Sequence, residues 1–294
     1  MHTAPPGSTP LSRTVTEPWV QVALSARVMQ QTLRSVPEVR SGAYLDVLRR
    51  FLPQEPVDVW CRGFLEASLE HLVMWADYAT PLKYHPEASV EFTLRPAQTL
   101  ARAALESAAQ AVWILSAADF RDAARRHAAL VLADWDEQRK AALDDATKAG
   151  LKRRSESLRE GLGFTDNETR PPTYLTLVRD ASAHVREQLP AALLGSDDAV
   201  ERLWRASAGS AHGKQWPASE LVVVNPSTGS TMPDPAAITA ILKLADAVVT
   251  YGVMRFADRS GYAAELSSIQ QSALAQVYAK IPLLPGAPSS PPSR

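Results

Sequence analysis

The chain has 294 residues, of which 46% are hydrophobic and 21% are charged, and its formal net charge is −1 at pH 7. This length suits one large domain or two small ones, and the near-zero charge excludes a protein that coats nucleic acid through overall basicity. A single cysteine, Cys61, excludes an intrachain disulfide and a zinc site built from several thiolates.

Both ends of the chain are predicted to be disordered tails. Residues 1–15 are rich in Pro, Ser and Thr, and residues 282–294 contain five prolines and few side chains that could join a core. Between the tails, residues 16–281 contain no clear linker. We therefore expect a single folded domain over 16–281.

The pattern within this domain is helical, because apolar residues recur with a helical period and Pro or Gly marks the ends of the segments. We expect helices over 17–35, 41–51, 55–79, 93–116, 118–160, 172–188, 197–212, 234–258 and 260–280. The segment 220–232, ELVVVNPSTGSTM, differs, since a β-branched run followed by turn signals predicts a short strand or small hairpin. The predicted fold class is all-α, a multi-helix bundle with a small β insertion.

A polar stripe runs along the helix expected over 93–116. Arg102, Glu106 and Gln110 are spaced four residues apart, which places them on one face of a helix that is otherwise rich in Ala and Leu. Such a helix should lie near the middle of the fold. Two interpretations are open: the stripe is a solvated edge with a surface ion pair, or Arg102 and Glu106 point into a cleft against another helix.

Basic residues cluster near the end of the helix expected over 118–160. Lys152, Arg153, Arg154 and Arg159 make this a candidate phosphate-binding patch. Acidic residues are interspersed along the same helix, as on an ordinary solvated face. The solvated face is the interpretation we favour.

The stretch 203–217, LWRASAGSAHGKQWP, contains the strongest candidate site. Arg205 and His212 are seven residues apart, which is about two helical turns and about 10 Å, so they share a face. Gly213 suits the position that ends a helix. Small residues such as Ser207 lie between them and would let another helix or a ligand approach.

The chemistry of this pair suits phosphate ester cleavage. The imidazole of His212 titrates near neutrality and can move a proton, and the guanidinium of Arg205 can hold phosphate oxygens. The structural alternative is that His212 caps the end of its helix or packs beside Trp216.

Arg205-x6-His212 resembles the R-x4-6-H signature of the HEPN superfamily, all-α domains that cleave RNA or bind nucleotides. The resemblance implies cleavage without metal, in which the histidine and arginine serve proton transfer and phosphate stabilisation around attack by the ribose 2′-OH. It also implies a site formed in a homodimer. The chain departs from the HEPN nuclease pattern at Ala206, where a polar residue is common.

Two further segments fit the R-x4-6-H signature, Arg121–His127 and Arg179–His184. We favour the stretch 203–217, because its surroundings are small and apolar and because a glycine and a tryptophan follow it directly.

A second resemblance combines the segments 102–108, RAALESA, and 203–213, LWRASAGSAHG. Together they resemble a group of uncharacterised actinobacterial helical proteins, over about residues 60–258. This resemblance implies no activity. It suggests only that a few residues act together, namely Arg102, Glu106, Ser207, His212 and Gly213.

Motifs for other chemistries are absent from the sequence. It contains no G-x-S-x-G, no phosphate-binding P-loop and no Glu-x-x-His pair of a di-iron bundle, so we expect no cofactor and no metal. The start of the chain lacks the apolar core of a signal peptide, and no uninterrupted apolar run approaches the roughly 20 residues of a membrane helix. We expect a cytoplasmic protein that does not enter a membrane.

These observations favour a HEPN-like, metal-independent ribonuclease of the toxin or phage-defence type, with RNA as substrate and a second copy of the chain as partner. Its catalytic residues would be Arg205 and His212, with supporting or binding roles for Arg102, Glu106, Ser207, Gly213 and Trp216. The alternative is a non-catalytic helical binding or dimerisation module. A third hypothesis is a tryptophan-lined small-molecule pocket closed by residues 213–220.

Overall fold

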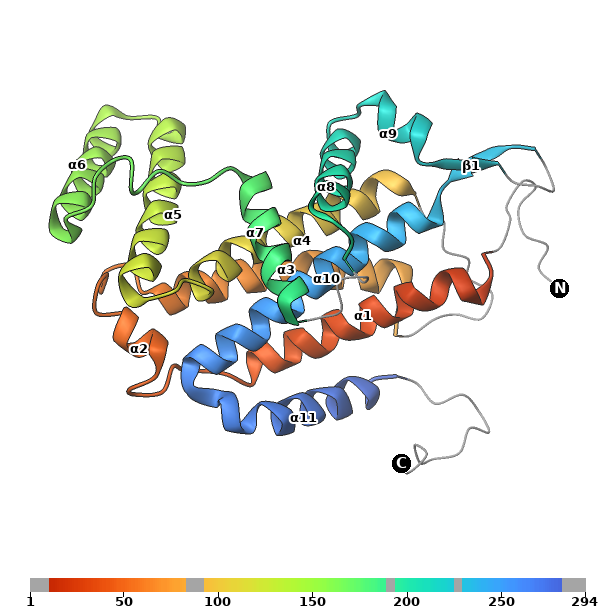
Figure 1. Cartoon of the computed structure of the whole chain (residues 1–294), viewed down its shortest axis with the longest axis horizontal. Coiled ribbons are helices and arrows are strands. Elements are labelled where there is room, and N and C mark those ends of the chain that lie inside the picture. The colour runs from red at the N-terminus through yellow and green to blue at the C-terminus, as the bar shows by residue number, and fades with distance from the viewer. Residues whose placement is uncertain (1–10, 83–92, 189–193, 225–228, 282–294) are drawn as a thin grey trace.

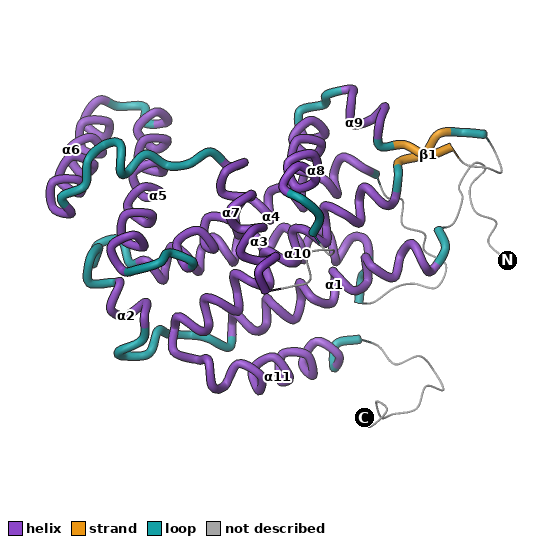
Figure 2. Tube along the Cα trace, in the orientation of Figure 1, coloured by secondary structure: helices purple, strands orange, loops and turns teal. Residues whose placement is uncertain are grey.

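The structure is a computed structural model that describes residues 11–82, 93–188, 194–224 and 229–281. Most of these residues form helices, which pack into a bundle with a two-stranded hairpin at one end (Figures 1 and 2). Most of the predicted N-terminal tail and all of the predicted C-terminal tail lie outside the described residues.

Nine helices precede the hairpin among the described residues: α1 (Arg13–Arg34), α2 (Tyr44–Leu48), α3 (Val57–Ala79), α4 (Leu94–Leu115), α5 (Phe120–Ala141), α6 (Asp145–Leu162), α7 (Tyr174–Gln188), α8 (Asp197–Ala211) and α9 (Gln215–Glu220). Strands β1 (Val222–Val224) and β2 (Thr231–Pro233) pair antiparallel, with Val223 opposite Met232. Helix α10 (Pro235–Ala257) follows, and a π turn and a 3-10 turn lead into α11 (Leu266–Tyr278). The predicted all-α class with a small hairpin is confirmed.

The contact between α4 and α10 occupies the middle of the bundle, with α3 packed on α4 and α1 packed on both α3 and α10 (Figure 1). Alanines such as Ala101, Ala104 and Ala108 are fully buried on α4. Because alanine is small, neighbouring helices approach α4 closely. The prediction that this helix lies near the middle is confirmed.

Three helices meet at Gly252 of α10. A Cβ atom at this position would lie 2.8 Å from Cδ2 of Leu65 on α3 and 3.3 Å from Cγ2 of Val112 on α4. The first distance is too short for two carbon atoms, so a side chain at position 252 would force the buried Leu65 or α10 itself to move.

The prediction of one long helix over 118–160 is wrong, because the chain reverses after Ala141. Ala142 is extended, and the carboxylate of Asp144 accepts a hydrogen bond from the backbone N–H of Thr147 at 2.8 Å, which starts a new helix. The reversal lets α5 and α6 pack on each other around a second, smaller core, made of Leu52, Val131, Leu132, Trp135 and Leu151. The α5–α6 hairpin stands at the end of the bundle away from the strands (Figure 1).

Helix α1 begins earlier than predicted, at Arg13, within the predicted tail 1–15. The carbonyl of Ser12 accepts hydrogen bonds from the N–H groups of Val15 and Thr16, which closes a first turn that composition did not indicate. Residues 11–15 therefore belong to the folded part of the chain.

The last helix begins later than the predicted 260. Gly261 has a φ of +93°, in the left-handed region that favours glycine, and it bends the chain between α10 and α11. Regular α-helix resumes only at Leu266.

One described stretch, Pro235–Tyr278, is long and apolar enough to cross a membrane by length and composition. It contains α10, which packs against α1, α3 and α4, and 56% of its most apolar window is buried. The hydrophobicity of α10 thus already serves the core of the bundle.

Gly252→Ala should lower the free energy of unfolding by about 1–3 kcal/mol, because the added methyl group overpacks the contact with Leu65. Urea titration followed by circular dichroism should show a lower midpoint with an unchanged slope. The matched control is Gly63→Ala on the exposed face of α3, where a Cβ atom meets nothing within 4 Å. That change should stabilise the protein by about 0.5–1 kcal/mol. Equal urea midpoints for the two variants would contradict the close approach of α10 to α3 at Gly252.

Candidate functional site

Arg102 and Glu106 lie in the seam between α4 and α8. Arg102 Nε donates to Glu106 Oε1 at 2.8 Å, and the indole Nε1 of Trp204 donates to the same oxygen at 2.7 Å. The guanidinium also lies 5.3 Å from the centroid of the Trp204 ring. The two charged side chains are only 19% and 16% exposed. Arg102 and Glu106 therefore face another helix, as one interpretation held, and the Glu106 carboxylate is already hydrogen bonded by both Arg102 and Trp204.

The serines of α8 continue this seam. The hydroxyl of Ser207, which is fully buried, donates to the carbonyl of Leu203 at 2.9 Å. The hydroxyl of Ser210 donates to the side-chain oxygen of Gln98, a fully buried residue of α4. The Ser210–Gln98 bond joins α8 to α4, whereas the Ser207 hydroxyl is taken up by a carbonyl of its own helix.

Arg205 and His212 lie on the exposed side of α8. The side chain of Arg205 is 58% exposed, and its Nε donates to Glu201 Oε1 at 2.5 Å. Glu201 is shared with Arg179 of α7. His212 is the exposed residue that ends α8, and its backbone N–H donates to the carbonyl of Ala208 at 3.1 Å. The structure does not bring this pair together with Arg102 and Glu106.

Gly213 lies in the turn after α8, and Trp216 lies on the short helix α9 that follows. Gly213 has a φ of +69°, and the next N–H, of Lys214, donates to the carbonyl of Gly209 at 2.8 Å. Helix α9 then folds back on α8, so that a Cβ atom at Gly209 would lie 2.8 Å from Cγ of Pro217. The predicted end of α8 is confirmed, whereas the helix over 215–220 and the requirement for glycine at position 209 were missed.

A shallow hollow of about 370 Å³ lies beside this turn. It is lined by Asp198, Glu201, Arg202, Arg205 and Trp216. Its charges are balanced, since Arg202 pairs with Glu220 at 2.8 Å and Arg205 pairs with Glu201. A phosphate bound here would compete with these carboxylates.

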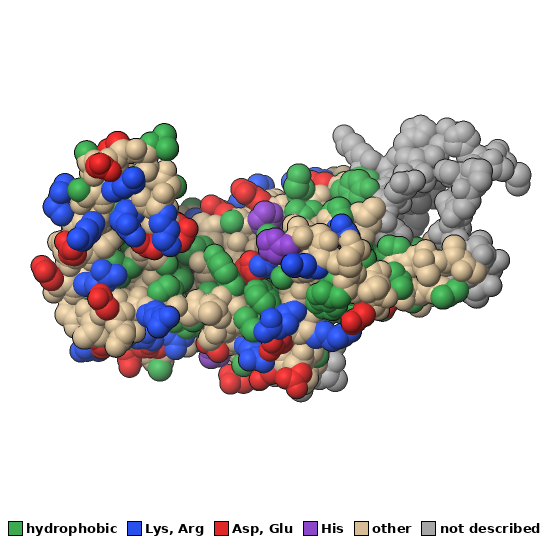
Figure 3. Space-filling view, turned by 90° about the horizontal axis from the view of Figure 1, so that it is seen from above, with side chains coloured by type: hydrophobic (Ala, Val, Ile, Leu, Met, Phe, Trp, Pro, Cys, Tyr) green, Lys and Arg blue, Asp and Glu red, His purple; other side chains and the backbone are tan. Residues whose placement is uncertain are grey.

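Arginines of the basic cluster on α6 also form ion pairs with acidic side chains. Arg154 pairs with Glu55 at 2.9 Å and lies over the ring of Trp135, and Arg159 pairs with Asp166 at 2.9 Å. Figure 3 shows Lys and Arg interspersed with Asp and Glu over this part of the surface. The arrangement is that of a solvated helix face.

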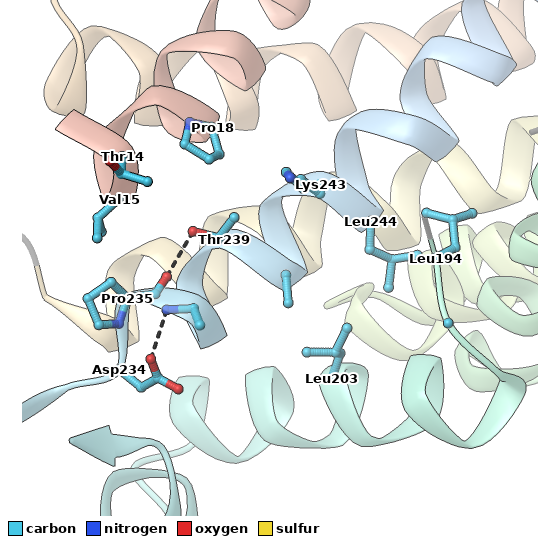
Figure 4. A pocket seen from close by; sticks show the side chains of 13 residues that line it. Thr14, Val15, Pro18, Leu194, Leu203, Asp234, Pro235, Thr239, Lys243 and Leu244 are labelled. Atoms are coloured by element: carbon cyan, nitrogen blue, oxygen red, sulfur yellow. Dashed lines mark hydrogen bonds between the residues drawn. The ribbon is translucent and has the colours of Figure 1, made fainter. Parts of the chain in front are cut away.

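A larger cleft, of about 620 Å³, lies between α1, α8 and α10 (Figure 4). Most of its lining is aliphatic; the residues are Thr14, Val15, Pro18, Leu194, Gly195, Leu203, Asp234, Pro235, Ala236, Thr239, Ala240, Lys243 and Leu244. Within the described part of the chain, the lining includes no tryptophan and no residue of 213–220, so the cleft differs from the pocket that the sequence suggested. None of the predicted site residues lies in it.

Hydrogen bonds fix the polar groups of this cleft. The hydroxyl of Thr239 accepts a hydrogen bond from Trp19 Nε1 at 2.8 Å and donates to the carbonyl of Pro235 at 2.9 Å. Asp234 caps α10, with its Oδ1 accepting from the N–H of Ala236 at 2.8 Å (Figure 4). Lys243 is exposed and forms no ion pair with any described residue. Lys243 is the one basic residue in the otherwise apolar segment 235–254 of the sequence. That isolated charge could have identified it as a candidate binding residue.

Asp246 lies one turn beyond Lys243, in the seam between α10 and α1. The hydroxyl of Ser25 donates a hydrogen bond to it, but its Oδ1 is buried without a partner among the described residues. Burial raises the pKa of this carboxyl to about 7. The carboxyl is thus half protonated near neutral pH.

Among the described residues, no three His, Cys, Asp or Glu side chains lie close enough to hold a metal ion. Comparisons with protein-family models, with curated proteins and with solved structures found no match to this chain. Its function has to be inferred from its own residues.

The raised pKa of Asp246 predicts a pH-dependent stability. Between pH 4 and 7 the folded protein keeps a proton on Asp246 that the unfolded chain releases, so the contribution of Asp246 to stability is greatest at the acid end and falls as pH rises toward 7. Asp246→Asn removes this loss, and at pH 8 it should stabilise the protein by about 2 kcal/mol relative to wild type. At pH 4 the difference should nearly vanish.

Urea titrations of the two proteins at several pH values would measure the effect. Asp145→Asn, at the exposed start of α6, is the control and should follow the wild type throughout. A constant difference between wild type and Asp246→Asn from pH 4 to pH 8 would refute the raised pKa.

Proposed function

We propose that the chain is a non-catalytic helical binding protein whose ligand is a small, largely apolar molecule held between α1, α8 and α10. The observation that carries this proposal is the cleft of about 620 Å³ with mainly aliphatic walls. Pockets that bind small molecules usually have volumes of about 300–1,000 Å³, apolar linings and a few fixed polar groups. The cleft has each of these properties.

The walls of the cleft are supported by regular structure. Leu203 lies on α8, Leu244 lies on α10, and Pro18 lies on α1 (Figure 4). The hydrogen bond from Trp19 to Thr239 joins α1 to α10 beside the cleft. Because the walls are packed helices, little conformational entropy is lost when a ligand binds. Most of the free energy gained by burying apolar ligand surface therefore contributes to affinity.

Filling the cleft should abolish binding. N-phenyl-1-naphthylamine, an uncharged apolar dye that fluoresces when it leaves water, should bind the wild-type protein with micromolar affinity. Ala240→Trp places an indole among the lining residues and should reduce dye binding at least about tenfold. Fluorescence titration measures the effect, and thermal melts check that the variants fold.

The matched control is Ala275→Trp on the exposed face of α11, which adds the same ring away from the cleft. This variant should bind the dye as the wild type does. The proposal fails if the wild type does not bind the dye, or if Ala240→Trp binds as well as the control.

A second candidate function is the metal-independent ribonuclease that the HEPN resemblance implies. The observation that favours it is that Arg205 and His212 are both exposed on one helix, and that Arg205 shares a hollow with Trp216. An aromatic ring and a guanidinium suit a stacked base and a phosphate. In this proposal Arg205 exchanges Glu201 for a phosphate, and a second copy of the chain completes the site.

A cleavage assay on mixed RNA in EDTA tests this candidate. Attack of the ribose 2′-oxygen on phosphorus with departure of the 5′-oxygen would leave 2′,3′-cyclic phosphate ends, and Arg205→Ala and His212→Ala should each lose at least about 100-fold in rate. His184→Ala, in the rival Arg179–His184 segment, is the control and should cleave normally. Absence of cleavage by the wild type at high concentration, or equal loss in the control, would eliminate this candidate.

A further inference from the structure

We propose that the cleft between α1, α8 and α10 selects an amphipathic organic acid, whose carboxylate pairs with Lys243 and whose aliphatic part lies between Leu203 and Leu244. The inference rests on the proposed binding function, because it names the ligand class of the same cleft.

The charges of the cleft favour an anion. Among the described residues that line it, only two are charged, Asp234 and Lys243. Asp234 already serves as the cap of α10, where its carboxylate accepts an N–H and lies at the positive end of the helix dipole. Lys243 has no such partner among the described residues. A bound carboxylate would supply the missing countercharge.

The two charges are also well separated. Lys243 lies nine residues beyond Asp234 on α10, which corresponds to about 13 Å along the helix axis. Asp246, one turn further, is not part of the lining, and its hydrogen bond is to Ser25 on α1. The ammonium group of Lys243 therefore does not have to release a carboxylate of the protein before it binds a ligand.

The kind of anion follows from what the cleft lacks. The described residues of its lining include no arginine that could bind a phosphate with two parallel hydrogen bonds. The first free N–H groups of α10 are engaged as well, since those of Ala236 and Ala237 both donate to Asp234. One ammonium group matches the single charge of a carboxylate better than the higher charge of a phosphate.

The position of Lys243 fits a ligand that enters with its apolar end first. Its side chain is exposed, so a carboxylate bound there stays near water and loses little hydration. The aliphatic part then replaces water against Leu194, Leu203 and Leu244, whose side chains gather at one side of the cleft (Figure 4). Affinity comes from the apolar walls, and selectivity comes from Lys243.

Three probes with the same chain and different head groups test this inference: dodecanoate, dodecan-1-ol and dodecylammonium. Calorimetric titrations are run at pH 8, below the concentrations at which the probes aggregate. Dodecanoate should bind at least about tenfold more tightly than the alcohol, and dodecylammonium should bind most weakly. Lys243→Met should remove the preference for dodecanoate while the affinity for the alcohol stays within about twofold. Lys280→Met, after α11, is the control and should retain the preference.

Three other results of these titrations would overturn the inference. Equal binding of the acid and the alcohol, unchanged in Lys243→Met, would overturn the inference and leave the apolar binding function standing. Tightest binding of dodecylammonium would also overturn it and would point to Asp234. Binding of none of the probes, together with no binding of N-phenyl-1-naphthylamine, would overturn the inference and the proposed function together.

Discussion

The packing of α4 against its neighbours is the constraint on which the rest of the structure depends. Toward α10 and α3, α4 presents fully buried small and aliphatic side chains such as Ala104 and Val112, and the helices meet as closely as Gly252 allows. Toward α8 it presents Gln98, Arg102 and Glu106. The first contact builds the core. The second holds α8 through hydrogen bonds and so sets where one wall of the cleft stands.

The cluster of Arg102, Glu106 and Trp204 shows how residues that look catalytic in a sequence can hold a fold together. A partly buried carboxylate is stable only if its oxygens are hydrogen bonded, and Glu106 receives one bond from a guanidinium and one from an indole. The same contacts place the guanidinium near the face of the Trp204 ring. Removing Glu106 would leave the guanidinium and the indole without their acceptor, and removing Arg102 would leave the carboxylate without its countercharge. Such mutual dependence suits a fixed joint between helices better than a site that exchanges ligands.

Local patterns predicted local structure well. The helical periodicity located most of the helices, the Asn-Pro and Thr-Gly signals located the hairpin, and Gly213 marked the end of α8. The break in 118–160 was missed because its signal is a single capping interaction of Asp144 with Thr147, in a segment whose composition favours helix on both sides. The walls of the cleft were missed for a different reason, because they come from segments far apart in the chain and a single sequence does not say which helix faces meet. Glu201, by contrast, lies four residues before Arg205 on the same helix, a spacing that the sequence itself shows.

The spacing of Arg205 and His212 fixes their common face but not the chemistry of that face, which depends on the side chains around it. Here Glu201, one turn earlier on α8, brings a charge of the opposite sign to Arg205 and also pairs with Arg179 of α7, whereas no described residue does so for Lys243. A lysine that stays unpaired beside aliphatic walls is a stronger mark of ligand recognition than an arginine already bound to a carboxylate. The reason is energetic: a ligand gains the whole attraction of a free cation, but only the difference between itself and the resident carboxylate at a paired one.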